Sequence, residues 1–139
     1  YGCAKMGLNC TIATPADYAP DAEVVENAKE DFKKGGSNLL LTQDPKEAIK
    51  DADVVYSDTW VSMGQESEKA ERLKIFMPYQ INKELFSLAK SDAIFMHCLP
   101  AYRGYEVTED VIDGPQSVIF DEAENRLHAQ KAVMATLMK

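Results

Sequence analysis

Residues 93–105 read Ala-Ile-Phe-Met-His-Cys-Leu-Pro-Ala-Tyr-Arg-Gly-Tyr, an apolar segment that runs directly into a polar loop. The first four residues predict a buried strand, while Pro100 and Gly104 favour a loop and a turn. His97 and Cys98 therefore stand at a strand tip, where an open α/β sheet presents reactive groups to a ligand. The same pair could instead be a satisfied core histidine and a small buried thiol, and only the rest of the chain can decide between these interpretations.

Strand and helix patterns alternate along the chain. Short β-branched or apolar runs predict five strands, at residues 10–14, 39–42, 53–57, 93–96 and 117–120. Helices are expected to end near residue 8, to form around residue 110, and to occupy residues 21–34, 46–50, 67–76, 82–89 and 122–138. Helical spacing predicts that the first long helix buries Val24, Val25, Ala28 and Phe32, and that the last buries Leu127, Ala132, Val133 and Leu137. The alternation predicts an α/β fold, a doubly wound, Rossmann-like parallel sheet with helices on both faces.

Composition excludes several classes of protein. The 139 residues include 45% hydrophobic and 27% charged residues, which is ordinary for one globular domain with a core of its own. No apolar run approaches the roughly 20 residues that cross a bilayer, and no secretory signal pattern opens the chain, so we expect no membrane partner. A net charge of −8 without a dense basic segment argues against nucleic acid as a partner.

Cysteine usage indicates a reducing compartment. Cys3, Cys10 and Cys98 are widely spaced and form neither a CxxC pair nor a Cys/His cluster of the zinc type. We therefore expect reduced thiols in a cytoplasmic protein, and no metal site. Because no GxGxxG or phosphate-loop pattern occurs in the sequence, no nucleotide cofactor is expected either.

Polar residues follow three of the predicted strands. The segments are Asp-Thr-Trp-Val-Ser-Met-Gly at 58–64, His-Cys-Leu-Pro at 97–100 and Asp-Glu-Ala-Glu-Asn-Arg at 121–126. Ligands of open α/β sheets bind outside the carboxyl ends of the strands. Three polar segments on one edge therefore predict a small-molecule site there.

Each of these residues also has a simpler role. Asp58 could cap a turn or hold a substrate amine, and Trp60 could pack or line a pocket. Residues 62–64 could be a plain turn or could offer backbone amides to an anion. Arg126 lies near the start of a helix, where it could pair with a neighbouring glutamate or grip a phosphate or carbonyl oxygen.

Together, the three segments resemble ornithine carbamoyltransferase. The matching residues, in the family's order, are Asp58-x-Trp60-x-Ser62-Met63-Gly64, His97-Cys98-Leu99-Pro100 and Asp121-Glu122-Ala123-Glu124-Asn125-Arg126. The Ser-Met-Gly and His-Cys-Leu-Pro segments favour the ornithine enzyme over its aspartate, putrescine and acetylornithine relatives. The resemblance implies transfer of a carbamoyl group from carbamoyl phosphate to the δ-amino group of L-ornithine, which gives L-citrulline and phosphate.

The resemblance also implies roles for single residues on the ornithine side of the site. Asp58 would bind the α-amino group, and Ser62 and Met63 would belong to a loop that closes on ornithine. Cys98 would lie near the δ-amino group, as its proton acceptor or as an orienting group.

On the carbamoyl side, Leu99 would contact the carbamoyl end together with Cys98. Arg126 would polarise the carbamoyl carbonyl oxygen. These implied catalytic residues, Cys98 and Arg126, need no cofactor.

Parts of the family pattern do not occur in this sequence. The Ser-Thr-Arg-Thr and His-Pro-x-Gln segments of the family's N-terminal domain are missing, as is the first strand of the ornithine domain. Residues 1–139 are therefore expected to be a partial ornithine-binding domain that does not form citrulline alone, from an enzyme that is a homotrimer when complete. Tyr102 stands where His is more common in the family, a change that we expect to leave the chemistry intact.

Two other classes of function remain open. A stand-alone module could bind an amino acid at the same sheet edge without catalysis. A structural or interaction protein could use the polar strand ends only as turns. Binding of ornithine without catalysis would favour the module, and no binding of any amino acid or phosphate would favour the structural protein.

Overall fold

The computed structural model describes residues 1–61, 64 and 66–138, so Ser62 and Met63, two predicted site residues, lie outside the described residues. The chain divides into two compact units, Tyr1–Lys50 and Asp51–Lys139, and each is described by itself. The α/β class with parallel strands is confirmed, and the described strands form two two-stranded sheets, β1–β2 and β3–β4, with one sheet in each unit. None of the described helices has the length and apolar character that a membrane span requires.

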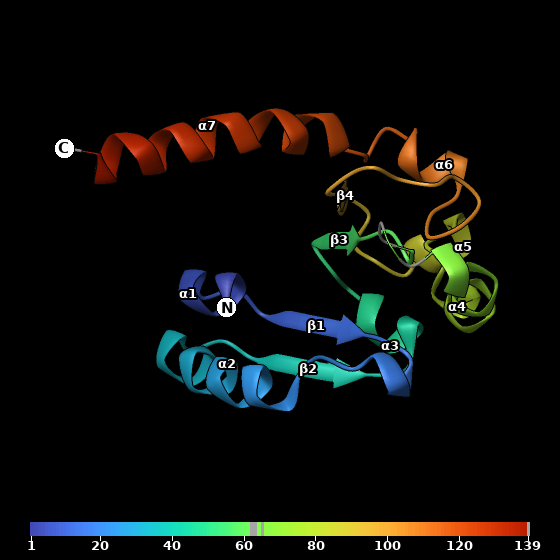
Figure 1. Cartoon of the computed structure of the whole chain (residues 1–139), viewed down its shortest axis with the longest axis horizontal. Helices are drawn as coiled ribbons and strands as arrows, with labels where there is room; N and C mark the ends of the chain where they lie inside the picture. The colour runs from blue at the N-terminus through green and yellow to red at the C-terminus, as the bar shows by residue number, and fades with distance from the viewer. Residues whose placement is uncertain (62–63, 65, 139) are drawn as a thin grey trace. The chain divides into compact units, whose positions relative to one another are not determined.

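The first unit is a β-α-β arrangement with short helices at its ends (Figure 1). Its elements are α1 (Gly2–Met6), β1 (Cys10–Ala13), η1 (Ala16–Tyr18), α2 (Ala22–Gly35), β2 (Leu39–Thr42) and α3 (Pro45–Ile49). The two strands pair in parallel, in a register that runs from Cys10 opposite Leu39 to Ala13 opposite Thr42. The predicted helices and strands of this unit are thus confirmed, within one or two residues at their ends.

Helix α2 shows why the sequence specified this unit well. The Asp21 side chain accepts hydrogen bonds from the backbone N–H groups of the first turn, and Gly36 closes the helix with a φ of 69°. Val25, Ala28 and Phe32 are buried as predicted, but Val24 is 45% exposed because it lies at the edge of the apolar face.

Helix α1 approaches α2 closely at one glycine. A Cβ atom built on Gly35 would lie 2.6 Å from the carbonyl oxygen of Ala4, which is 1% exposed. Only a residue without a side chain fits this contact, so Gly35 is required for packing, while Gly36 ends the helix.

The second unit holds the other sheet and the longest helix. Its elements are β3 (Val54–Ser57), η2 (Glu66–Glu68), α4 (Lys69–Phe76), η3 (Met77–Tyr79), α5 (Lys83–Phe86), β4 (Ile94–His97), α6 (Glu109–Ile112) and α7 (Ile119–Leu137). Strands β3 and β4 pair in parallel, from Val54 opposite Ile94 to Ser57 opposite His97. Phe95 at 0% exposure and Val107 at 0% lie at the centre of the buried core of this unit.

The predicted fifth strand, residues 117–120, is wrong. Only Ser117 pairs with Phe95, as an isolated bridge, and α7 already begins at Ile119. The bridge uses both backbone groups of Phe95, which donates to Gln116 and accepts from Val118. Acidic residues in the next turn then favour the start of a helix over a longer strand, because they complement the helix dipole.

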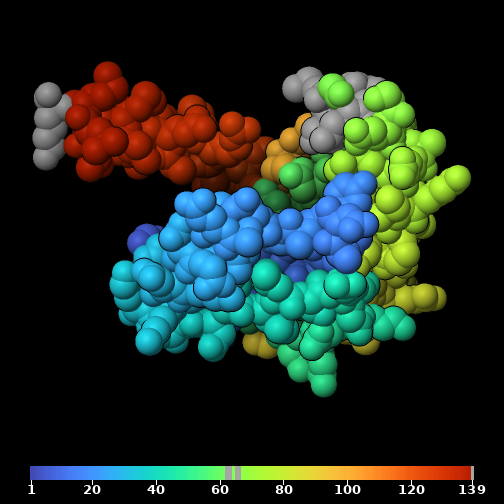
Figure 2. Space-filling view, turned by 60° about the horizontal axis from the view of Figure 1, so that its bottom comes forward, coloured from blue at the N-terminus to red at the C-terminus, as the bar shows by residue number. Residues whose placement is uncertain are grey.

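The predicted inner face of the last helix is also wrong. Leu127 and Val133 are each 57% exposed, Leu137 is 76% exposed, and Ala132 is exposed as well. Helix α7 packs against β4 only near its first turn, where Ile119 is buried, and then extends from the rest of its unit with a large exposed surface (Figure 2). Helical spacing identifies residues that share a face, but it does not say whether anything covers that face.

Candidate functional site

The register of β3 and β4 decides which side chains share a face of the second sheet. Val55 and its partner Phe95 are both buried, so they mark the core face. Side chains alternate along a strand, so Tyr56 and its partner Met96 point to the opposite face. Asp58 and Cys98, which directly follow the two strands, are further along on the same side as Tyr56 and Met96.

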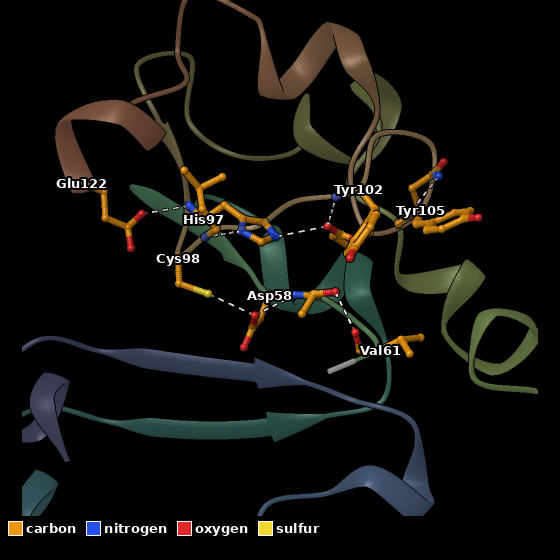
Figure 3. Close-up of polar contacts among 11 residues, drawn as sticks. Asp58, Val61, His97, Cys98, Tyr102, Tyr105 and Glu122 are labelled. Carbon is orange, nitrogen blue, oxygen red and sulfur yellow. Dashed lines mark hydrogen bonds and ion pairs between the residues drawn. The ribbon is translucent and has the colours of Figure 1, made fainter. Parts of the chain in front are cut away.

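Asp58 and Cys98 are brought into direct contact at these strand ends. The Cys98 thiol donates a hydrogen bond to Oδ1 of Asp58, with 3.0 Å between sulfur and oxygen (Figure 3). The same oxygen accepts the backbone N–H of Thr59 at 2.7 Å, which holds the carboxylate in place. Asp58 therefore caps its own turn and also faces Cys98, while its role toward a substrate amine stays a prediction.

Burial and two neighbours set the pKa of Cys98. Burial raises the pKa of the thiol, the hydrogen bond to Asp58 raises it further, and a hydrogen bond with Tyr56 lowers it. A carboxylate that accepts the S–H bond favours the neutral thiol. In this state the pair presents one negative charge, on Asp58, beside a protonated sulfur.

His97 supports the strand tip from the core side. Its side chain is 0% exposed, and its Nδ1 accepts the backbone N–H of Leu99 at 2.9 Å. Leu99 has a φ of 55°, which is uncommon for a residue other than glycine, and this hydrogen bond holds it there. The backbone N–H of His97 donates to Oε2 of Glu122 at 2.9 Å, which ties the tip of β4 to the start of α7.

Glu106 faces the other side of the His97 ring. Its side chain is 1% exposed, and its Oε1 lies 3.3 Å from Nε2 of His97 and accepts the backbone N–H of Tyr102 at 2.5 Å. Nε2 lies beside the Glu106 carboxylate but makes no hydrogen bond of good geometry among the described residues. Since Nδ1 accepts a hydrogen bond, the ring proton of a neutral His97 is on Nε2 and faces the carboxylate. Sequence reasoning missed Glu106, because a glutamate in a loop is ordinarily exposed.

The remaining predicted residues occupy different places. Trp60 packs in the core of its unit, 8% exposed and stacked on Phe76 with ring centroids 5.9 Å apart. Arg126 is exposed on α7, one turn after Glu122, and the predicted alternative of a salt bridge to a neighbouring glutamate is not seen among the ion pairs of the described residues. The structure thus brings Asp58, Cys98 and Leu99 together, and it shows no direct contact of Arg126 with them.

The potential metal-ligating side chains do not form a metal centre in the part of the chain that the structure describes. No group of three or more His, Cys, Asp or Glu side chains there could hold an ion. Cys3, Cys10 and Cys98 are free thiols. The chemistry available at the described strand ends is therefore that of a carboxylate, a thiol and a phenol, which suits the binding of an amine and the movement of its proton.

Comparisons of the sequence and of the structure with known proteins indicate the same family. Residues 1–137 match the sequence pattern of the aspartate/ornithine carbamoyltransferase Asp/Orn-binding domain. The chain is 65% identical over 133 residues to an ornithine carbamoyltransferase of Caldicellulosiruptor saccharolyticus, a match that covers 96% of this chain and 43% of the relative.

Solved structures agree with the sequence comparison. The ornithine carbamoyltransferase of Pyrococcus furiosus superposes with a TM-score of 0.90 at 56% identity, over 95% of this chain and 42% of that one. The anabolic enzyme of Campylobacter jejuni superposes with a TM-score of 0.92 at 44% identity, over 97% and 45%. The chain therefore spans less than half the length of the relatives that it matches.

Proposed function

Because the chain belongs to the aspartate/ornithine carbamoyltransferase family, through its Asp/Orn-binding domain, we propose that residues 1–139 are the ornithine-binding part of an ornithine carbamoyltransferase. The reaction of the complete enzyme is transfer of the carbamoyl group of carbamoyl phosphate to the δ-amino group of L-ornithine. Its products are L-citrulline and phosphate. Ornithine and carbamoyl phosphate are the small-molecule partners, and a homotrimer is the proposed assembly.

The observation that carries this proposal is the contact between Asp58 and Cys98. Asp58 offers a negative charge held by the backbone of its own turn, which suits a cationic α-amino group. Cys98 stands beside it, half-buried, where a second amine on the same small molecule could reach the sulfur. An amino acid with amines at both ends fits this pair better than an amino acid with a carboxylate side chain.

The proposed chemistry begins with the δ-amino group. An unperturbed amine of this kind has a pKa of about 10, so it must lose a proton before it can attack. The neutral nitrogen attacks the carbamoyl carbon, a carbon–nitrogen bond forms, and the carbon–oxygen bond to phosphate breaks. Cys98 orients the amine as a thiol, or accepts the amine proton as a thiolate after its own proton has passed to Oδ1 of Asp58.

The other proposed residues act on the carbamoyl group and on access to the site. The Arg126 guanidinium is exposed, so it is available to a carbonyl oxygen on which charge develops during the attack. Leu99 contacts the carbamoyl end, and Ser62 and Met63 belong to the loop that excludes water. The phosphate group is bound by residues of the longer enzyme, so this chain alone is expected to be inactive.

A titration calorimetry experiment tests the proposal. A bisubstrate analogue that joins a phosphonoacetyl group to ornithine is added to this chain and to a chimera, in which this chain replaces the matching region of the Caldicellulosiruptor saccharolyticus relative. The proposal predicts tight binding by the chimera, and binding by this chain that is weaker by about a thousandfold or more because the phosphonate has lost its contacts.

Two results would count against the proposal. Equal affinities of the two proteins would indicate a stand-alone amino-acid-binding module, because the phosphonate would then contribute nothing. If a folded chimera did not bind the analogue, the proposed ornithine site would be wrong.

A further inference from the structure

Tyr56 lies beside the reactive pair, although no sequence motif includes it. It is opposite Met96 in the parallel register of β3 and β4, two residues before Asp58. The alternation of side chains along both strands puts Tyr56 on the same face as Asp58 and Cys98. The residue is 54% exposed as a whole, and its hydroxyl is the partly buried end.

The Tyr56 hydroxyl has two hydrogen-bonding neighbours, Cys98 and Glu122. The proton of Cys98 is directed to Asp58, which leaves the lone pairs of the sulfur free to accept. Glu122 also accepts the backbone N–H of His97, which fixes its carboxylate near the hydroxyl. A phenol has a single proton, and it can therefore donate to the sulfur or to the carboxylate, but not to both at once.

The hydroxyl is suited to act as a donor and not as a base. Burial raises the pKa of Tyr56, and its hydrogen bonds with Cys98 and Glu122 raise it further. The phenol thus keeps its proton over the whole neutral range of pH. A retained proton beside a sulfur atom favours the thiolate over the thiol, whereas the carboxylate of Asp58 favours the thiol.

We propose that Tyr56 is a positioning residue for Cys98, whose hydroxyl turns from Glu122 to the sulfur and donates a hydrogen bond whenever the thiol gives up its proton. The relevance of this step to carbamoyl transfer rests on the function proposed above. There, Tyr56 holds the sulfur toward the substrate amine and stabilises the negative charge that appears on the sulfur when the Cys98 proton passes to Oδ1 of Asp58, which already accepts the S–H hydrogen bond. The phenol of Tyr56 keeps its own proton throughout this step.

Alkylation of Cys98 tests this role without any need for catalysis. The 139-residue chain and its Tyr56→Phe variant are treated with iodoacetamide over a range of pH, and the modification of each cysteine is followed by mass spectrometry of its peptide. Only the thiolate reacts, so loss of the donor should slow modification of Cys98 by about threefold to tenfold at neutral pH and move its profile to higher pH.

The chain provides matched controls. Tyr1→Phe removes a hydroxyl from the other unit and should leave the Cys98 profile unchanged. Cys3 and Cys10 in the Tyr56→Phe protein should react as in the parent, which excludes a general change in folding. An unchanged Cys98 profile in Tyr56→Phe, equal to that of Tyr1→Phe, would overturn the inference.

The chimera separates this inference from the proposed function. Tyr56→Phe in the chimera should lower kcat by about threefold to tenfold with a smaller change in KM for ornithine, because the hydroxyl acts on the sulfur and not on the bound amino acid. If the chimera forms no citrulline while the alkylation profile still shifts, the proposed function fails and the role of Tyr56 stands. If citrulline forms and the alkylation profile does not shift, only the role of Tyr56 fails.

Discussion

The Cys98 thiol donates a hydrogen bond to Oδ1 of Asp58 at 3.0 Å, across 40 residues of sequence. Parallel pairing of Ser57 with His97 produces this contact, because it places the residues after the two strands next to each other. The pair therefore depends on the sheet and not on a local motif. The contact raises the pKa of Cys98, because the neighbouring negative charge favours the protonated sulfur.

Replacement of Asp58 by Asn should make Cys98 more reactive. Burial and Asp58 both raise the pKa of Cys98, and the substitution removes the charge while it keeps a similar shape. The pKa should fall, the thiolate fraction should rise, and iodoacetamide should modify Cys98 about threefold to tenfold faster at neutral pH. Asp17→Asn, in the other unit, is the matched control, and slower or unchanged modification in Asp58→Asn would contradict the account of the pair.

Cys98→Ala should impair the chimera far more than Cys3→Ala. Cys98 is at the proposed site, whereas Cys3 packs beside the cluster of Ala4, Ala28 and Phe32 in the other unit. We expect kcat/KM for ornithine to fall by about a hundredfold or more for Cys98→Ala, and by less than about threefold for Cys3→Ala. If the two substitutions lowered kcat/KM equally in a steady-state citrulline assay, Cys98 would not belong to the site.

His97→Ala should destabilise the second unit. Its ring is 0% exposed, and without it the Glu106 carboxylate would stay buried beside a cavity. Removing a buried ring that fills the space beside a carboxylate costs about 3 kcal/mol, whereas a surface histidine contributes within about 0.5 kcal/mol. The free energy of unfolding, followed in urea by the fluorescence of Trp60, should show this difference between His97→Ala and the control His128→Ala. Equal stabilities would mean that the contact of His97 with Glu106 contributes nothing.

Gly35→Ala should destabilise the first unit through a steric clash. The new Cβ would lie 2.6 Å from the Ala4 carbonyl oxygen, which is backbone and cannot rotate away. Overpacking of this kind costs about 1–3 kcal/mol. Hydrogen exchange of the α1 and α2 amides should accelerate in this variant. Gly2→Ala, whose Cβ would meet nothing within 4 Å, should leave exchange unchanged, and the same behaviour of both variants would refute the close contact.

Much of the fold could be predicted because its signals are local. Asp21 before α2 and Gly36 after it set both ends of that helix through hydrogen bonds within a few residues. Asp58 and Cys98 could be placed together because both follow strands of one parallel sheet. Neither inference required knowledge of the packing between distant segments of the chain.

The rest depended on contacts between distant segments. The start of α7 at Ile119 is decided by the bridge of Ser117 to Phe95, and strand propensity alone suggested a longer strand. Glu106 is buried because His97 lies above it, which no spacing indicates. Tyr56 could have been found, since residues two apart on a strand share a face and Asp58 was already a candidate.

The most direct test of the account is a steady-state assay of citrulline formation by the chimera, with this chain alone as the reference. With carbamoyl phosphate and L-ornithine, the chimera should form citrulline with a kcat/KM within about tenfold of the unaltered relative, because it keeps the proposed ornithine residues and regains the phosphate site. The chain alone should form none, and L-aspartate should not replace ornithine. A folded chimera without activity, or comparable turnover by the chain alone, would contradict the proposal that residues 1–139 supply the ornithine-binding part of the enzyme.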